Sequence, residues 1–283
     1  MFQNEFVRRY KGIPIARYAH VARRVELPDM LTTPQLHKEF ELLLITQGRV
    51  RVSIDDRSYL AGEGDLLFIG PYMLHSLEIP PKEVFSHICF CFDLELLSHK
   101  ALAGDLAAGR YQITGHIPVD SPHNAPLRGI FTAIDSAYDR EPPYWELTVR
   151  GELCRMFAWL MQNGLYESPF AQSRDKDFCI RVYRHIEEHY REKLDSAAAA
   201  EALNYNQSYF CRLFKRNFLM TFSDYLNMYR LEKAKSLLSD PARSVSGIAA
   251  EVGFSNVSYF TKLFRLQNGQ SPQSFRKDIC NLF

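Results

Sequence analysis

The chain has 283 residues, 46% of them apolar, and a formal net charge of +1. That length favours two domains over one, and the apolar content is enough to bury a full core. The start lacks the apolar stretch of a signal peptide and no run of about 18 apolar residues occurs, so we exclude a membrane-spanning protein and expect a cytoplasmic one with no membrane partner.

The small net charge hides an uneven distribution along the chain. From Asp175 onward the sequence holds 16 basic and 12 acidic side chains, a net charge of +4, whereas the residues before it hold 18 and 21, a net charge of −3. A mildly basic C-terminal part joined to a mildly acidic remainder is typical of a phosphate-facing module attached to a second domain. The asymmetry is small and establishes nothing alone.

The six cysteines are scattered, with no CxxC pair and no regular framework. We therefore expect free thiols and no zinc finger. Cys89 and Cys91 lie two apart on an expected strand, where they share a face but are poorly placed to bond each other, so we expect two buried thiols there.

Residues 40 to 92 have the pattern of an all-β domain. Short apolar or alternating runs, rich in Val, Ile and Phe, are separated by turn residues such as Gly48 and Gly70-Pro71. Several short strands of this kind predict a small barrel or sandwich. The expected strands are FELLLITQ (40–47), RVRVSI (49–54), LLFIG (66–70) and HICFCF (87–92).

Two amphipathic helices follow, and Pro142-Pro143 forces a break between them. We expect a helical hairpin over residues 126–165 and a polar linker over residues 166–176. The hairpin either covers the open face of the barrel or joins two subunits. The second helix carries an apolar stripe at near-heptad spacing, formed by Val149, Leu153, Met156 and Leu160.

The C-terminal part contains an internal repeat. NYNQSYFCRLFKR (204–216) matches GFSNVSYFTKLFR (253–265). Each copy follows a small residue, Ala200 or Ala249, at the position where a second helix would cross the first. The pattern is that of a helix-turn-helix, present twice.

The turn chemistry of a helix-turn-helix is also satisfied twice. Asn204 and Gly253 both tolerate the left-handed backbone that a sharp turn requires. Asn206 in the first copy, and either Ser255 or Asn256 in the second, can then cap the following helix. The outer face of that helix carries short polar groups with Arg and Lys, which suit base edges and phosphates. One such face alone is usually just solvated, but two copies in register favour DNA binding.

These stretches, with SVSGIAAEVGFSNVSYFTKLF and NGQSPQSFRK, resemble the DNA-binding domain of the AraC/XylS family of bacterial transcription regulators over residues 178–277. The resemblance implies seven helices, with residues 224–238 as a rigid helix that sets two recognition helices into successive major grooves, about 34 Å apart. It implies base contacts by Ser208, Cys211, Arg212, Ser258, Thr261 and Lys262. The expected phosphate contacts are Lys215, Arg216, Arg265, Asn206 and Asn256.

The first motif departs from the family pattern. Leu219 stands where the family usually has the glycine that ends the first recognition helix, whereas Gly269 keeps it in the second. Ser196 and Ala199 replace larger apolar residues before the first turn and pack less volume. We expect the second motif to be the cleaner copy.

Residues 37–48 and 64–75 resemble the two halves of the cupin signature, and in the regulator family such a barrel is the effector-binding domain. The expected fold has two domains: an N-terminal all-β cupin-like barrel with a helical hairpin, and a C-terminal all-α domain with two helix-turn-helix motifs. The barrel would span residues 1–125 and the DNA-binding domain residues 177–283.

The cupin resemblance raises the question of a metal. His37, Glu41 and His75 fall at three of the four cupin ligand positions, while Gln35 stands where another His would be. Imidazole and carboxylate together suit Fe, Mn, Ni or Zn, but sensor domains of this family usually bind organic effectors. We expect no metal cofactor and a pocket lined by His37, Glu41, His75 and Tyr72, with a carbohydrate as the effector.

The sequence therefore predicts a transcription regulator, an activator rather than a repressor, whose binding to double-stranded DNA is controlled by a small molecule in the barrel. By resemblance it is a homodimer joined through the hairpin stripe, it works with RNA polymerase, and it is not an enzyme. Two alternatives stay open: a metal-dependent cupin enzyme tethered to a DNA-binding domain, and a barrel that binds a partner protein without any ligand.

Overall fold

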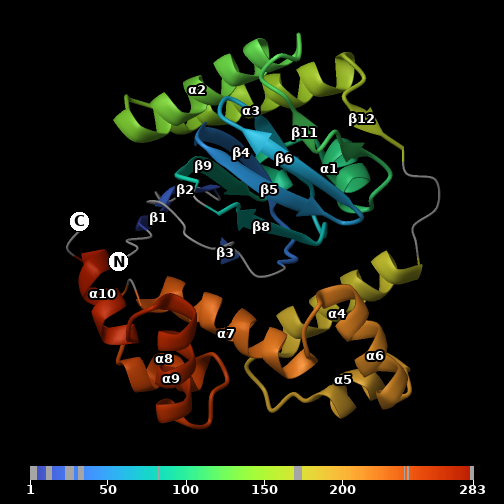
Figure 1. Cartoon of the computed structure of the whole chain (residues 1–283), viewed down its shortest axis with the longest axis vertical. Coiled ribbons are helices and arrows are strands. Elements are labelled where there is room, and N and C mark those ends of the chain that lie inside the picture. Colours follow the sequence, from blue (N-terminus) through green and yellow to red (C-terminus); the bar gives the residue numbers. More distant parts are fainter. Residues whose placement is uncertain are drawn as a thin grey trace. The chain divides into compact units, whose positions relative to one another are not determined.

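The computed structural model describes residues 5–10, 15–22, 29–30, 35–81, 83–168, 174–238, 240 and 242–280. The chain forms two compact units, residues 1–172 and 173–283 (Figure 1). The first unit combines β-sheets with a pair of long helices, and the second consists of helices. The predicted fold class, with a β-rich N-terminal unit and an all-α C-terminal unit, is confirmed.

Two antiparallel sheets form the first unit. The larger has the strand order β1-β2-β9-β4-β7-β11, the smaller has the order β3-β8-β5-β6, and β10 pairs with β12. The strands are β1 Glu5–Tyr10, β2 Ile15–Ala22, β3 Asp29–Met30, β4 Phe40–Gln47, β5 Arg49–Ile54, β6 Arg57–Gly62, β7 Leu66–Ile69, β8 His75–Ile79, β9 Phe85–Phe92, β10 Gln112–Ile113, β11 His116–Ile117 and β12 Tyr166–Glu167. The four predicted strands correspond to β4, β5, β7 and β9. The other strands were not predicted; RSYLAG of β6 and HSLEI of β8, for example, carry little of the apolar run that marks a strand.

The space between the two sheets is filled by apolar side chains. Side chains alternate along a strand, so Leu43 and Ile45 of β4 point to the smaller sheet, where they join Val52 of β5 and Leu77 of β8 in one buried cluster. The intervening residues of β4 point to the opposite face of the larger sheet, and both faces of this sheet are therefore buried.

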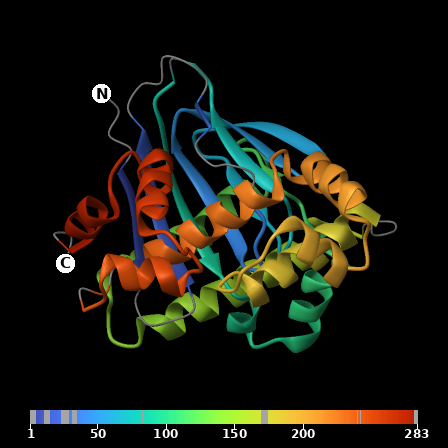
Figure 2. The same cartoon turned by 90° about the horizontal axis from the view of Figure 1, so that it is seen from below.

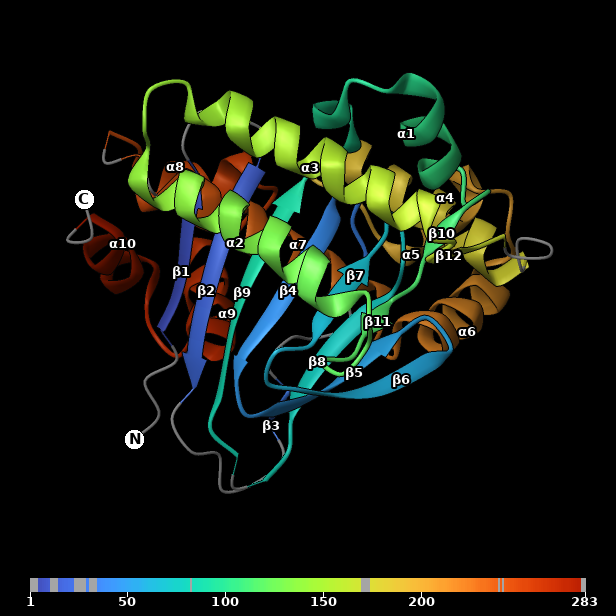
Figure 3. The ribbon, with the colours of Figure 1, turned by 90° about the horizontal axis from the view of Figure 1, so that it is seen from above.

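Two helices cover that opposite face. Helices α2 (Asn124–Arg140) and α3 (Trp145–Gln162) lie side by side across the larger sheet (Figure 3). Their inner side chains share one core with Phe40 of β4 and Phe90 of β9. A short 3-10 helix, η1 (Leu94–Leu97), and helix α1 (Lys100–Ala107) follow β9. The predicted hairpin exists, and it covers a sheet.

The residues predicted for the dimer interface are wrong. Val149, Leu153, Met156 and Leu160 are each at most 1% exposed and belong to the core between α3 and the larger sheet. A helix that lies on an apolar layer repeats its contacts every three to four residues, so this spacing reflects packing within one chain. Because these four side chains are buried within the chain, they cannot contact a second subunit.

The predicted linker over residues 166–176 is too long at both ends. Tyr166 and Glu167 form β12, which pairs with β10, and helix α4 begins at Arg174. Arg57 of β6 holds Glu167 through two hydrogen bonds of 2.7 and 2.6 Å. Composition did not reveal these contacts, because β10 and Arg57 are both far from β12 in the sequence, and Arg57 and Glu167 are 110 positions apart.

Seven helices form the second unit within the described part of the chain, as the family resemblance implied. They are α4 Arg174–His189, α5 Ser196–Ala202, α6 Gln207–Phe218, α7 Phe222–Leu238, α8 Val245–Glu251, α9 Val257–Asn268 and α10 Pro272–Cys280. Helices α5 and α6 form the first motif, and α8 and α9 form the second. Figure 2 shows α7, in orange, running between the two motifs.

Leu153 gives a test of the corrected role of the α3 stripe. We expect Leu153→Ala to lower the free energy of unfolding of the first unit by about 3 kcal/mol, because it leaves a cavity in a close-packed core. Urea unfolding followed by tryptophan fluorescence measures the change. Leu147→Ala is the control, since Leu147 lies on the same helix and is 67% exposed. Equal effects of the two substitutions would contradict the packing described above.

The end of α6 gives a second test. Leu219 ends this helix at a φ of 58°, in the left-handed region, and its side chain is 73% exposed. We expect Leu219→Gly to raise the free energy of unfolding of the second unit by about 1 kcal/mol, because glycine adopts this conformation without strain. The reverse exchange, Gly269→Leu, should lower it by a similar amount, since Gly269 has a φ of 71° at the equivalent position. Thermal melting of both variants measures the changes, and a destabilised Leu219→Gly would contradict this account.

Candidate DNA interface and effector site

The two turns have the backbone that the sequence predicted. Asn204 has a φ of 61° and Gly253 a φ of 93°, both in the left-handed region. The small residues before them, Ala200 and Ala249, are buried where the second helix of each motif packs. Each motif therefore folds through the same local chemistry, with asparagine replacing glycine in the first.

Asparagine side chains cap both recognition helices. The Asn206 carboxamide oxygen accepts hydrogen bonds from the backbone N–H groups of Ser208 and Tyr209, at 3.0 and 3.3 Å. In the second motif Asn256, not Ser255, accepts from the N–H of Tyr259 at 2.9 Å. Both oxygens thus serve the helix ends, and phosphate contacts by Asn206 and Asn256 stay a prediction.

The outer faces of α6 and α9 are open to solvent. The inner faces carry Phe210 and Phe214, and Phe260 and Phe264, all fully buried. A surface hollow on α9 is lined by Val257, Ser258, Thr261, Lys262 and Arg265. The residues predicted to contact DNA lie on these outer faces: Ser208, Cys211, Arg212, Lys215, Arg216, Ser258, Lys262 and Arg265 are exposed, and Thr261 is half-buried.

Two tyrosines on the same faces were missed as candidate contacts. Tyr209 and Tyr259 occupy equivalent positions of the two copies and are 49% and 47% exposed. The Tyr259 hydroxyl lies 3.5 Å from the amide nitrogen of Asn227 on α7. The repeat could have identified them, because its two copies align these two tyrosines, each next to a buried phenylalanine.

A buried arginine ties the first half of the unit to the second. Arg230 of α7 donates from Nε to the backbone oxygen of Tyr190 and from Nη2 to that of Glu192, both at 2.7 Å. Its guanidinium also lies 5.8 Å from the ring centre of Phe254, next to the turn of the second motif. A Cβ on Gly253 would lie 2.5 Å from the Tyr190 oxygen and 2.9 Å from Arg230 Nε. This role could not be predicted from the sequence, because an arginine on a helix usually faces solvent.

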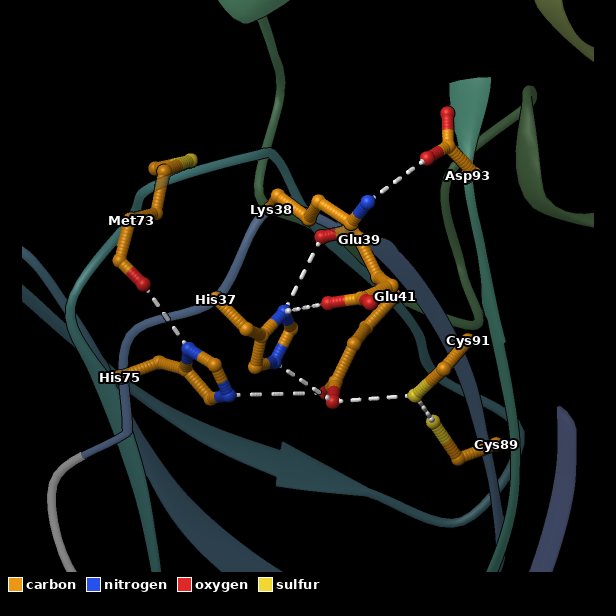
Figure 4. A network of polar contacts seen from close by, with 9 residues as sticks. All are labelled: His37, Lys38, Glu39, Glu41, Met73, His75, Cys89, Cys91 and Asp93. Carbon is orange, nitrogen blue, oxygen red and sulfur yellow. Dashed lines mark hydrogen bonds and ion pairs between the residues drawn. The ribbon is translucent and has the colours of Figure 1, made fainter. Parts of the chain in front are cut away.

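The predicted effector residues meet between the two sheets of the first unit (Figure 4). Glu41 lies on β4, His37 precedes that strand, and His75 begins β8. His37 Nε2 lies 3.0 Å from Glu41 Oε1, and His75 Nε2 lies 3.6 Å from Glu41 Oε2. Gln35, at the place of the missing cupin histidine, pairs with the backbone of His75.

Tyr72 lies next to this cluster in the chain. It is half-buried, its φ is 56°, and its backbone N–H donates to the carbonyl oxygen of His37 at 2.8 Å. The backbone of Tyr72 thus helps to hold His37 in place. A contact of its ring with an effector stays a prediction.

Two thiols complete the cluster, a contact that was not predicted from the sequence. In the register of β4 and β9, Glu41 stands opposite Cys91 and Leu43 opposite Cys89. The Cys91 thiol donates to Glu41 Oε1 at 3.1 Å, and the two sulfur atoms are 3.7 Å apart. Both thiols are free, as predicted, with Cys89 buried and Cys91 half-buried. Only the strand pairing brings them to Glu41.

Mutual contacts decide which group in the cluster is charged. Burial alone would raise the pKa of Glu41, but the neighbouring His75 and His37 hold it well below its usual range. Burial opposes the charge of His37, yet the hydrogen bond and the charge of Glu41 raise its pKa. At His75 burial prevails and lowers the pKa. Burial raises the pKa of Cys89 to about 11 and that of Cys91 well above its usual value. The cluster thus surrounds an ionised carboxylate with neutral thiols.

Comparison with known proteins identifies both units. Residues 17–143 match the family model of the AraC-like ligand binding domain, and residues 199–278 match that of a helix-turn-helix domain. The chain belongs to the AraC family of transcription regulators. It is therefore a DNA-binding regulator with a ligand-binding domain and not an enzyme, which removes the tethered cupin enzyme as an alternative.

Named relatives of this AraC-type regulator agree with the assignment. The chain is 27% identical to the uncharacterized HTH-type transcriptional regulator YdeC of Bacillus subtilis, over 85% of this chain and 84% of that protein. It is 23% identical to the HTH-type transcriptional activator RhaR of Yersinia pseudotuberculosis, over 88% and 86%. It is 31% identical to the Msm operon regulatory protein of Streptococcus mutans, over 48% and 49%.

A solved structure shows the same fold. The crystal structure of ToxT from Vibrio cholerae, with an unsaturated fatty acid bound, is 17% identical and has a TM-score of 0.58. The match covers 98% of this chain and 97% of ToxT. Among the described residues of the present chain, no helix combines the length and the apolar character needed to cross a membrane.

Arg230 gives a test of how the two motifs are joined. We expect Arg230→Met to lower the free energy of unfolding of the second unit by about 3 kcal/mol, because two buried carbonyl groups lose their donor. Urea denaturation measures the change. Arg212→Met is the matched control, since Arg212 is exposed on α6 and should change stability by less than about 0.5 kcal/mol. An unchanged Arg230→Met would show that the link is dispensable.

Proposed function

We propose that this regulator is a transcription activator that reads double-stranded DNA with both helix-turn-helix motifs and responds to a small-molecule effector. The observation that carries the proposal is the pair of equivalent, solvent-facing surfaces on α6 and α9, each with polar and basic side chains over a buried aromatic core. Such surfaces suit phosphates and base edges. The named activator RhaR, 23% identical, supports activation, and RNA polymerase is the partner that an activator needs.

We propose a neutral, hydroxylated small molecule, such as a carbohydrate, as the organic effector. The ionised carboxylate of Glu41 and the imidazoles of His37 and His75 are hydrogen-bonding partners for hydroxyl groups. The fatty acid bound by ToxT is a less suitable model, because its carboxylate would meet the buried negative charge of Glu41.

A homodimer in the cytoplasm stays part of the proposal, but it uses a surface other than the α3 stripe. Two copies would place four helix-turn-helix motifs on one DNA site, which raises affinity through effective concentration. The exposed apolar side chains of the hairpin include Tyr144 and Leu147, near its turn. Sedimentation of the purified protein measures the oligomeric state.

The two classes of DNA contact are separable by mutation. We expect Lys262→Ala to weaken binding to the preferred DNA site by about 1–3 kcal/mol and to relax the base preference at one position. We expect Lys215→Ala to weaken binding to all DNA sequences alike and to reduce the salt dependence of binding by about one counterion. Selection from a random duplex pool, followed by gel shifts at several salt concentrations, measures both. Identical behaviour of the two variants would contradict the assignment of roles.

A thermal-shift screen of sugars and other hydroxylated metabolites tests the effector. A ligand at about 100 times its Kd should stabilise the protein by roughly 2.7 kcal/mol. Glu41→Gln should abolish the shift, whereas Glu83→Gln, which changes a carboxylate paired with Arg49 outside the cluster, should keep it. A screen in which no hydroxylated compound shifts the melting temperature would count against a carbohydrate effector.

A further inference from the structure

We propose that Cys89 and Cys91 form a dithiol site that binds trivalent arsenic, supplied as arsenite or as an organic arsenical. Both cysteines lie on β9, and their sulfur atoms are 3.7 Å apart. The two sulfurs face each other next to the carboxylate of Glu41 (Figure 4). The inference goes beyond the proposed function, which assigns these thiols no ligand.

The strand holds the two thiols close together but disfavours a bond between them. Residues two apart on a strand point to the same face, and their Cα atoms are roughly 6.6 Å apart. That separation lies at the upper end of the range for a disulfide, whose sulfur atoms are about 2.05 Å apart. Strand β9 pairs with β2 on one side and with β4 on the other, so it cannot bend freely to shorten the distance. The sheet therefore favours two free thiols.

A single atom bonded to both sulfurs fits their spacing better than a direct bond. If each bond is about 2.3 Å long, as zinc–thiolate bonds are, one bridging atom spans roughly 3.3–3.8 Å as the angle opens from about 90° to tetrahedral. The sulfur atoms, 3.7 Å apart, lie within that span. Such an atom can join the two side chains with little movement of β9.

The protonation of the pair selects the chemical class of that atom. Burial raises the pKa of both thiols, and the negative charge of Glu41 raises it further. A divalent cation has to displace both thiol protons before it can bind, and peroxides or alkylating agents also require a thiolate. Arsenous acid is uncharged near neutral pH, and its condensation with two thiols releases no net proton. A pair of neutral, buried thiols therefore suits trivalent arsenic better than a cation.

The reaction balances without an oxidant or a reductant. Arsenous acid, As(OH)₃, exchanges two of its hydroxyl groups for the two sulfurs. Two As–O bonds and two S–H bonds break, two As–S bonds form, and each thiol proton leaves with a hydroxide as water. Arsenic stays trivalent, and both sulfurs stay fully reduced. An organic arsenical with two hydroxyl groups reacts in the same way and keeps its carbon substituent.

Cys91 offers the point of entry to the pair. It is half-buried, whereas Cys89 is 4% exposed, so the first As–S bond forms at Cys91 and the second within the chain. The Cys91 thiol donates to Glu41 Oε1 at 3.1 Å, and its proton is lost when arsenic binds. Glu41 then keeps its contacts with His37 and His75 alone. Occupancy of the thiols thus alters the polar cluster of the first unit.

Arsenite uptake by the full-length protein tests the inference. The protein is reduced with a phosphine, because dithiol reductants compete for arsenic, and free arsenite is removed by gel filtration. We expect elemental analysis to find one arsenic per chain. Cys89→Ala and Cys91→Ala should each bind more than about 100-fold more weakly, because the second bond depends on the high effective concentration of the neighbouring thiol. Cys154→Ala is the matched control, since Cys154 is an exposed thiol of the same unit, and it should bind like the wild type.

The pH dependence of binding separates arsenic from a metal cation as the ligand. Arsenite affinity should stay constant between about pH 6 and 8, whereas the affinity of thiols for a cation rises with pH, because protons are released. The same titration with Cd²⁺ provides the comparison. Stoichiometric uptake of Cd²⁺ by a protein that retains no arsenite would assign the pair to cations and refute the proposal.

Two further outcomes would overturn the inference: a folded wild type that retains no arsenic, or equal affinities of Cys91→Ala and Cys154→Ala. Thermal melting of the arsenic-free proteins identifies any variant that does not fold, and the serine variant at the same position then replaces it. DNA selection on the same preparations tests the proposed function separately. Sequence-selective DNA binding without arsenic uptake refutes the dithiol site alone.

Discussion

The relative orientation of α6 and α9, the second helices of the two motifs, depends on the buried charge of Arg230. The guanidinium stays ionised in proteins, so its burial is tolerated only because two backbone carbonyl groups accept its protons. Those carbonyls belong to the segment that leads into the first motif, while Gly253 and Phe254 of the second motif pack on the same guanidinium. The two motifs therefore cannot rotate independently without leaving a charge unpaired. The outward residues of α6 and α9 take no part in this contact, so they can differ without disturbing it.

The first unit is organised around a sheet that is buried on both faces. One face of the larger sheet packs on the smaller sheet, and the other packs on α2 and α3. This arrangement accounts for the α3 stripe, because the helix contributes it to the core. It also confines polar chemistry to a few interior positions, among them those of Glu41, His37, His75 and His87. A polar cluster at such a place costs stability unless its members satisfy one another.

Glu41 shows how one buried charge restricts what the first unit binds. An ionised carboxylate away from water is unfavourable unless it is paired, and here the imidazoles and the Cys91 thiol serve that purpose. An anionic ligand would add to the negative charge, whereas a cation or a neutral hydroxylated molecule would not. The family fold alone does not make this distinction. It follows from the residues that line the barrel in this particular chain.

Features that depend on neighbouring residues could be predicted from the sequence, whereas contacts between distant segments could not. The repeat predicted both turns, their left-handed residues Asn204 and Gly253, and the helix caps, because each depends on residues only a few positions apart. The pairing of Glu41 with Cys91 and the contact of Arg230 with Tyr190 join residues that are 50 and 40 positions apart. The order of the strands likewise depends on pairings between distant segments, such as Ile15 with Phe92. The face on which the stripe Val149 to Leu160 packs was equally undetermined, because an apolar helix face looks the same whether a sheet or a second subunit covers it. The sequence by itself determined the fold class and the two helix-turn-helix motifs. Only the tertiary structure decided which side chains share the buried cluster and which apolar surface is already in use.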